Sequence, residues 1–242
     1  MSQLIFLAAQ VCELAYGDSG QLFLDTGYKD VCHIVDEETS TEAFVLEDAN
    51  YIYVTFPGTE NDEGLADIKT DIRFANRKSF HDMKLHRGFW EAWASIASEV
   101  ATEVLERVMD DGTGKAPKSI IYCGHSLGGA LATIGAATHN PQYCITFGAP
   151  PVGGKKFGEY ISEMACTFTR VVNDGDPVPH ALFWHLAYRQ CGDLYFYDEK
   201  LNVHRDPSLF KRIGLRGIHQ FDLSDHRMNN YSSISFINRG EA

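Results

Sequence analysis

The spacing of apolar residues near the N-terminus predicts a helix followed by three strands. Apolar side chains recur every three or four positions over about residues 3–16, which is typical of an amphipathic helix. These side chains are Leu4, Leu7, Ala8, Val11, Leu14 and Ala15. Segments near 30–36 and 42–48 have the composition of short strands. The signal is stronger over 51–56, where aromatic and β-branched residues dominate and a Pro-Gly pair follows.

Further along the chain, strand and helix signals alternate. The predicted elements are a helix over 89–108, a buried strand over 119–123, a small-residue helix over 127–139, a strand over 142–147, a helix over 155–164, a strand over 168–172, a strand near 193–197 and a last helix after His226. This alternation implies a parallel sheet with helices on its faces. Ligands of such sheets bind beyond the carboxyl ends of the strands, so reactive residues should directly follow strands.

The composition is that of a globular protein. The chain has 242 residues, of which 44% are apolar and 22% charged, and it has no low-complexity segment, long linker or internal repeat. We therefore expect a single domain over residues 1–242. The formal net charge of −12 disfavours nucleic acid as a partner, because the phosphate backbone is also negative. It also disfavours electrostatic docking on anionic lipid, so any contact with a lipid–water interface should be apolar, local and transient.

The N-terminal segment and the cysteines bear on the compartment. The apolar stretch at residues 4–9 is short and lacks a basic flank, so we expect no secretory signal. No window is long enough for a transmembrane segment. The protein should then be cytoplasmic, or exported by a route that needs no such signal. The six cysteines lack C-x-x-C spacing, which disfavours a zinc site and favours buried thiols, with disulfides left open.

A candidate nucleophile lies between the strand at 119–123 and the helix at 127–139. Residues 124–128 read Gly-His-Ser-Leu-Gly, which matches G-x-S-x-G. A serine on so tight a strand–turn–helix connection is held above the sheet edge, and the flanking glycines avoid clashes between strand and helix. The predicted nucleophile is Ser126, and the alternative is a tight turn with no chemical role.

A serine hydroxyl needs a base, and the base needs an orienting acid. In hydrolases with this turn, both partners follow the serine in the chain. The strand at 168–172 is followed by Asp174 and Asp176, and spacing alone does not choose between them. The histidines downstream are His139, His180, His185, His204, His219 and His226. His226 would lie on a short loop before the last helix, which Ser224 or Asp225 could cap.

Six motifs in order make the chain similar to the class 3 lipases, the fungal-type triacylglycerol lipases and their relatives. They are Phe56-Pro57-Gly58-Thr59, His86-Arg87-Gly88-Phe89 with Ala92-Trp93, Gly124–Ala130, Thr146–Pro150 with Val152-Gly153 and Phe157, Asp176–Pro179, and His226 with Asn230-Tyr231. Two departures are Pro57 and Pro151, which stand where the family usually has arginine.

The resemblance implies an α/β-hydrolase fold with a central, mostly parallel sheet flanked by helices. It implies that Ser126 is the nucleophile, Asp176 the acid and His226 the base. It also implies oxyanion donors at Thr59 (backbone N–H and hydroxyl) and at the backbone N–H of Leu127. Such a mechanism requires no cofactor and no metal.

The resemblance further implies an ester hydrolase, and the preferred prediction is a triacylglycerol lipase. Short-chain esterase, phospholipase A1 and feruloyl esterase are alternatives on the same scaffold, and a non-catalytic lipid- or protein-binding relative is a remote one. A lid helix is expected within residues 60–80, where the apolar residues Leu65, Ile68 and Ile72 share one helical face. A small helix packed permanently on the domain is the alternative for that segment.

Overall fold

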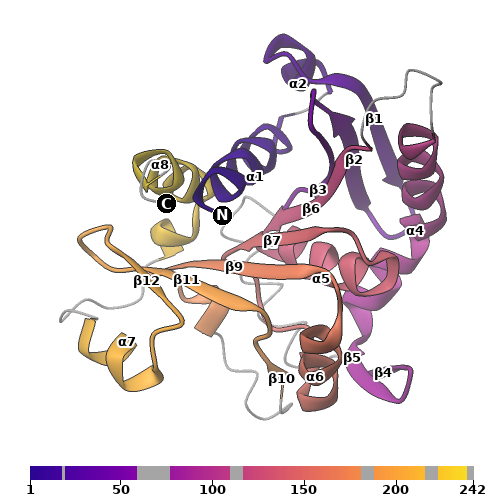
Figure 1. The fold of residues 1–242 in the computed structure, drawn as a ribbon. Coiled ribbons are helices and arrows are strands. Elements are labelled where there is room, and N and C mark those ends of the chain that lie inside the picture. The colour runs from indigo at the N-terminus through magenta and orange to yellow at the C-terminus, as the bar shows by residue number, and fades with distance from the viewer. Residues whose placement is uncertain (18–19, 59–76, 110–116, 181–187, 216–222, 239–242) are drawn as a thin grey trace.

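An eight-stranded sheet forms the centre of the computed structural model, which describes residues 1–17, 20–58, 77–109, 117–180, 188–215 and 223–238 (Figure 1). In spatial order the strands are β1 (Lys29–Asp36), β2 (Thr41–Glu47), β3 (Tyr51–Phe56), β6 (Ser119–His125), β7 (Tyr143–Phe147), β9 (Thr167–Asn173), β11 (Asp193–Tyr197) and β12 (Val203–Arg205). The strands from β3 to β11 pair in parallel, whereas β1, β2 and β12 join as antiparallel edges. This arrangement confirms the predicted, mostly parallel sheet.

Helices cover both faces of the sheet, as predicted (Figure 1). One face carries α1 (Ser2–Leu14) and α8 (Met228–Asn238), which contact each other. The other face carries α4 (Arg87–Val108), α5 (Leu127–His139) and α6 (Lys155–Glu163). Of the helices in the described ranges, none is both long and apolar enough to cross a bilayer.

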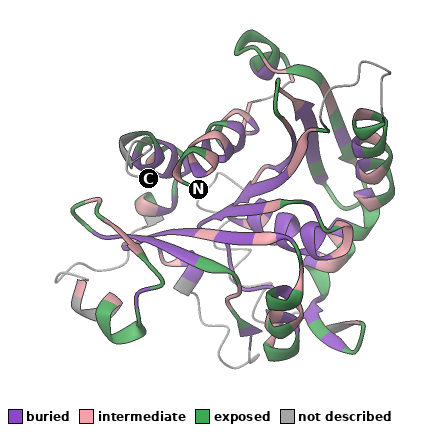
Figure 2. Cartoon of the chain, in the orientation of Figure 1, coloured by how far each residue is buried: buried purple, intermediate pink, exposed green. Residues whose placement is uncertain are grey.

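The core lies in two layers, one on each side of the central strands (Figure 2). On the α4 and α5 side, Phe56, Trp93 and Tyr122 pack edge to face. On the α1 and α8 side, Phe147 packs against Tyr231 in the same way. Each such aromatic side chain contributes roughly 1.5–3 kcal/mol on burial, so the central strands form a firm base for groups held at their ends.

A second, smaller sheet was not predicted from the sequence. Its strands, in spatial order, are β10 (Tyr188–Arg189), β8 (Gly153–Gly154), β5 (Met83–His86) and β4 (Arg77–Phe80). The hairpin from β4 to β5 turns at His81 and Asp82, whose φ angles are +46° and +60°. Two-residue hairpins with positive φ usually carry Asn-Gly or Asp-Gly, so a His-Asp pair gave no turn signal. Residues 77–80, at the end of the segment in which a lid helix was expected, therefore form a strand and not a helix.

Several short elements complete the chain. They are α2 (Gln21–Asp25), α7 (Leu209–Leu215) and the 3₁₀ turns η1 (Val178–His180) and η3 (Leu223–His226). The predicted longer elements are present, and each boundary lies within two residues of its prediction. All six cysteines are free, with Cys12, Cys123, Cys144 and Cys166 buried, which agrees with the expected buried thiols.

Candidate active site

Ser126 lies on the turn between β6 and α5, with φ 56° and ψ −125°. A non-glycine residue in this region carries strain of about 1–3 kcal/mol, which the surrounding structure must hold in place. The glycines on either side explain how the turn closes. A Cβ on Gly124 would lie 2.3 Å from the Gly128 carbonyl oxygen, and one on Gly128 would lie 2.0 Å from the Phe56 carbonyl oxygen. Only glycine fits at these two positions, as the motif predicts.

The structure brings Ser126, His226 and Asp176 together at the carboxyl-end edge of the parallel strands. His226 Nε2 lies 2.8 Å from Ser126 Oγ, and His226 Nδ1 lies 2.8 Å from Asp176 Oδ2. Since a carboxylate oxygen only accepts hydrogen bonds, Nδ1 is the donor to Asp176. Nε2 of the neutral ring is then the acceptor that faces the serine hydroxyl. This is the arrangement that a general base needs before it takes a proton from serine.

Asp176 follows β9 and is held by two further donors. Its Oδ1 accepts from the Val178 backbone N–H at 2.8 Å, and its Oδ2 accepts from the Tyr231 hydroxyl at 2.5 Å. Burial, followed by the charge of Asp176, raises the pKa of Tyr231 far above its ordinary value. Tyr231 therefore stays a neutral donor, and the carboxylate is fixed in the orientation that His226 meets.

The site is closed to solvent. Ser126 and His226 are each 1% exposed, and Asp176 is fully buried. Electrostatic interactions strengthen where water is excluded, so the contacts among these three side chains count for more than they would at the surface.

Gly148, directly after β7, lies against the side chains of Asp176 and His226. Its φ is +56°, and a Cβ there would lie 2.6 Å from Asp176 Oδ2 and 3.1 Å from His226 Nδ1. Glycine is needed at this position for two reasons: the backbone is left-handed, and Asp176 and His226 approach it closely. This gives a physical reason for the glycine in the Thr-Phe-Gly-Ala-Pro motif.

One of the two predicted oxyanion donors lies within the described residues. Leu127 is the first residue of α5, where backbone N–H groups have no acceptor inside the helix. Thr59 lies outside the described residues, as does the predicted lid apart from the β4 residues 77–80. Gly58, the residue before Thr59, is described, and a Cβ there would lie 3.0 Å from Ser126 Cβ. The segment after β3 therefore begins directly beside the serine.

The other candidates from the sequence are placed elsewhere or lie outside the described side chains. Asp174, the second aspartate of the loop, donates its backbone N–H to the Tyr197 carbonyl oxygen. His139 contacts Tyr122, and His204 contacts Asp198. Of the candidate bases whose side chains are described, His226 is the one that contacts Ser126. No cluster of three metal-binding side chains occurs within the described residues.

Two tyrosines lie in the site without a role predicted for them. Tyr231 was noted as part of the last motif, but nothing in the sequence indicated that it contacts Asp176. Tyr16 follows α1 and contacts His125, the residue before the nucleophile, at 2.5 Å. A helix-end tyrosine more than 100 positions before the motif carries no local signal of such a contact.

Known proteins resemble this chain in sequence. The model of the family "Lipase (class 3)" matches residues 53–186, which is more than half of the chain. A secreted mono- and diacylglycerol lipase of Fusarium solani is 32% identical over 118 residues, 47% of this chain and 34% of that protein. Phospholipase A1-Igamma1, chloroplastic, of Arabidopsis thaliana is 30% identical over 217 residues, 70% of this chain and 41% of that protein. The chain thus spans less than half the length of these two relatives.

Solved structures show the same fold. The triacylglyceride lipase of Rhizomucor miehei superposes with a TM-score of 0.76 at 19% identity, over 92% of this chain and 91% of that one. At such identity the likeness concerns the fold alone, and the family follows from the sequence match. The chain belongs to the class 3 lipase family, whose members are hydrolases of the α/β-hydrolase fold.

Proposed function

We propose that the protein is a serine carboxylester hydrolase that works through an acyl-enzyme on Ser126. The observation that carries the proposal is the hydrogen-bonded chain from Ser126 Oγ through both ring nitrogens of His226 to Asp176. This series of hydrogen bonds is buried, and it needs a strained serine and a glycine with left-handed backbone to form. Such strain lowers stability, so a protein without this chemistry would have little reason to keep it.

Each residue then has a defined task. His226 accepts the hydroxyl proton at Nε2 while Ser126 Oγ attacks the ester carbonyl carbon. Asp176 stabilises the imidazolium that forms and holds its tautomer. The backbone N–H of Leu127, with Thr59 as the second donor, stabilises the oxyanion; loss of one such donor typically costs about 10²–10³-fold in rate. His226 next protonates the leaving alcohol, and water releases the acyl group by the reverse proton path.

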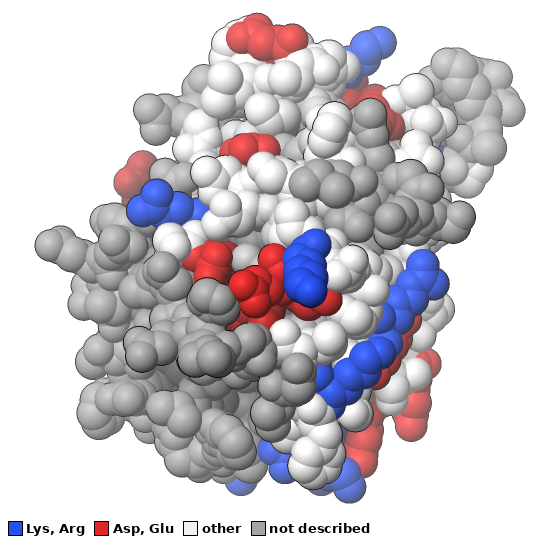
Figure 3. Space-filling view, turned by 90° about the vertical axis from the view of Figure 1, so that its left-hand side faces the viewer, with Lys and Arg blue, Asp and Glu red and all other residues white. Residues whose placement is uncertain are grey.

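For the substrate we propose a neutral glyceride ester, so that the protein is a triacylglycerol lipase. The chain carries a formal charge of −12, which opposes approach to anionic lipid. On the face shown in Figure 3, Asp and Glu side chains gather near the centre with Lys or Arg beside them, and many of the other described side chains are uncharged. A neutral ester meets no repulsion there. The Fusarium relative, named as a mono- and diacylglycerol lipase, supports the same substrate class.

Phospholipase A1 is the second candidate. It is favoured by the chloroplastic phospholipase A1 of Arabidopsis, which matches a larger part of this chain than the Fusarium lipase does. The two candidates share the acyl chemistry and differ in the group attached to glycerol. They can therefore be separated by substrate alone.

A hydrolysis panel tests the function and the substrate class together. It should contain p-nitrophenyl esters from acetate to oleate, triolein, phosphatidylcholine and methyl ferulate. We expect hydrolysis of p-nitrophenyl esters and triolein, with Ser126→Ala inactive on all of them. Faster release of fatty acid from phosphatidylcholine than from triolein would favour phospholipase A1. Turnover that persists in Ser126→Ala would contradict the acyl-enzyme.

The expected lid within residues 60–80 stays a prediction. Its consequence is measurable because Ser126 is buried and a lid that opens on lipid would admit substrate only at an interface. The rate on tributyrin should then rise sharply once the substrate exceeds its solubility limit. A rate that follows simple saturation through that limit would remove the switch and leave the hydrolase proposal intact.

A further inference from the structure

His125, the residue directly before the nucleophile, is buried between two groups that come from distant parts of the chain. Its Nδ1 lies 2.5 Å from the Tyr16 hydroxyl, and its Nε2 lies 2.5 Å from the backbone carbonyl oxygen of His226. Tyr16 follows α1, whereas His226 ends η3. The side chain of His125 therefore links the N-terminal helix to the backbone of the proposed catalytic base.

These contacts fix the tautomer of the neutral His125 ring. A carbonyl oxygen only accepts, so the contact with His226 requires a hydrogen on Nε2. In a neutral imidazole Nδ1 is then the acceptor, and the Tyr16 hydroxyl must donate to it. Reversing the tautomer would place the Nε2 lone pair against the carbonyl oxygen and leave the bond to His226 unmade.

The surroundings of the ring disfavour a positive charge. The rings of His125 and His226 lie 4.6 Å apart between centroids, and the Tyr231 ring lies 5.7 Å away. Burial, followed by the proximity of His226, lowers the pKa of His125 well below its ordinary value. Asp176 is engaged with His226 Nδ1. The groups that face His125 are thus two phenols and the imidazole of the base.

We propose that Tyr16 and His125 are positioning residues, which anchor the His226 carbonyl and keep an uncharged neighbour beside His226 while it holds the serine proton. The inference rests on the proposed function, since it assigns His226 the role of base. A second cation beside His226 would oppose the imidazolium that forms during attack. The Tyr16 hydrogen bond prevents this, because it stabilises the neutral form of His125.

The kinetic test compares two phenol deletions of the same kind. Tyr16→Phe removes the donor to His125 Nδ1. Tyr122→Phe removes the matching contact, 2.8 Å long, from the middle of β6 to His139 Nδ1 at the end of α5. Without its donor, neutral His125 is less favoured and takes a proton more readily. We expect Tyr16→Phe to lower kcat about tenfold, the size of one buried hydrogen bond. We also expect it to lose activity on acidification at a higher pH than wild type.

The control and the rescue make this test specific. Tyr122→Phe should keep the wild-type pH profile, although it removes a similar buried contact. His125→Gln should retain more activity than His125→Leu, because the amide can donate to the His226 carbonyl oxygen, accept from Tyr16 and never ionise. Equal profiles for Tyr16→Phe and wild type, or equal losses for His125→Gln and His125→Leu, would overturn the proposal.

A readout that does not depend on hydrolysis separates this inference from the proposed function. Nitrogen-15 NMR of the imidazole rings reports the tautomer directly, with His125→Gln used to assign the signal. We expect wild-type His125 to be neutral with hydrogen on Nε2 from pH 8 to pH 5. A ring that titrates at an ordinary histidine pKa, or that carries hydrogen on Nδ1, would overturn the proposal even if the enzyme hydrolyses esters. Absence of any hydrolysis with the expected tautomer would instead contradict the proposed function.

Discussion

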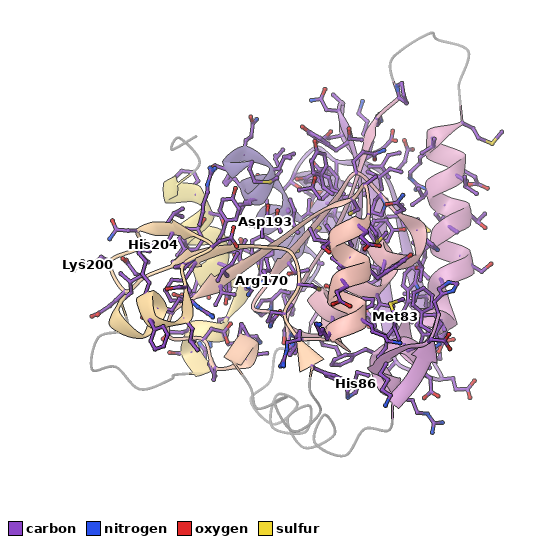
Figure 4. All side chains as sticks on the ribbon, turned by 60° about the horizontal axis from the view of Figure 1, so that its bottom comes forward. Met83, His86, Arg170, Asp193, Lys200 and His204 are labelled. Carbon is purple, nitrogen blue, oxygen red and sulfur yellow. The ribbon has the colours of Figure 1, made fainter. Side chains whose placement is uncertain are left out.

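Two histidine–aspartate pairs among the described side chains have the same nitrogen-to-oxygen distance and different surroundings. His226 Nδ1 and Asp176 Oδ2 are 2.8 Å apart, as are His204 Nε2 and Asp198 Oδ2. The first pair is buried, with side-chain exposures of 2% and 0%, whereas those of the second pair are 18% and 10%. His204 lies beside Lys200 on the hairpin that joins β11 and β12 (Figure 4).

The two aspartates use their remaining contacts differently. Asp198 accepts from the backbone N–H groups of Lys200 and Asn202, which are bonds that shape a turn. Asp176 accepts from Tyr231 and orients a histidine that meets a serine. The comparison teaches that a short histidine–aspartate contact does not identify a catalytic pair. Our proposal for His226 and Asp176 rests instead on the serine that His226 also contacts and on the burial of the pair.

The largest difference between the pairs should appear on removal of the carboxylate charge. Asp176→Asn removes the acceptor that fixes the His226 tautomer, and such a change lowers kcat about 10⁴-fold in a comparable triad. Asp198→Asn is the matched control, and its kcat should equal that of wild type. Steady-state rates on p-nitrophenyl butyrate measure both. Similar losses in the two variants would mean that the hairpin pair also serves the reaction.

A smaller loss of kcat should follow when a side chain is added at Gly148, beside the buried pair of His226 and Asp176. Gly148→Ala places a Cβ 2.6 Å from Asp176 Oδ2, so the carboxylate and His226 must shift. A misplacement of about 1 Å can lower the rate on the order of 10²-fold. Gly27→Ala is the control, because Gly27 has φ +95° and no atom within 4 Å of the added Cβ. Thermal unfolding and kcat of both variants separate backbone strain, which both share, from displacement of the pair.

Loss of the phenol donor to Asp176 should cost less again. Tyr231→Phe removes one hydrogen bond to a carboxylate, worth about 1.5–3 kcal/mol, so we expect kcat to fall roughly tenfold to a hundredfold. Tyr53→Phe deletes the same kind of bond, from a tyrosine hydroxyl to Asp48 Oδ2 at 2.7 Å. That variant should lose stability and keep its kcat. A full-rate Tyr231→Phe would show that His226 and the Val178 backbone N–H suffice to orient Asp176.

The smallest effect concerns the hairpin pair, where only stability should change. Burial raises the pKa of Asp198, but hydrogen bonds from His204 and Asn202 outweigh it and the net pKa is lowered. Because the pKa of Asp198 is lower in the folded than in the unfolded protein, the ionised carboxylate stabilises the fold above the unfolded pKa of about 3.9. This stabilisation is lost as the pH falls through the folded pKa. Asp198→Asn should therefore be less stable than wild type by about 1 kcal/mol at pH 7, with the gap closing below pH 4. A difference in stability between wild type and Asp198→Asn that widens as the pH falls would contradict this prediction.

Much of the fold was predictable because the signals were local. The strand at residues 51–56 and the small-residue helix at 127–139 are present as β3 and α5, with nearly the same bounds. Both segments are rich in apolar residues because they are buried at the central sheet. This pattern is visible within each segment and outweighs weak conformational preferences of single residues. The second sheet was missed because its strands are two to four residues long, its β4–β5 hairpin has no turn signal, and β5, β8 and β10 join across long separations.

The predicted triad residues meet because each directly follows a strand or precedes a helix, and strand ends converge at one edge. The sequence did not reveal the contacts that support them. The approach of Tyr16 to His125 depends on how α1 packs against β6, and that of Tyr231 depends on how α8 docks. Such contacts join residues more than 50 positions apart, so no spacing rule indicates them.

The central claim is that His226 and Asp176 make Ser126 a nucleophile, and a fluorophosphonate probe tests it most directly. The probe forms a covalent bond only with an activated serine. We predict one probe per wild-type chain, located on the peptide that contains Ser126. We predict no labelling of Ser126→Ala and much slower labelling of Asp176→Asn. A folded wild-type protein that stays unlabelled, or labelling that persists in Ser126→Ala, would contradict the account.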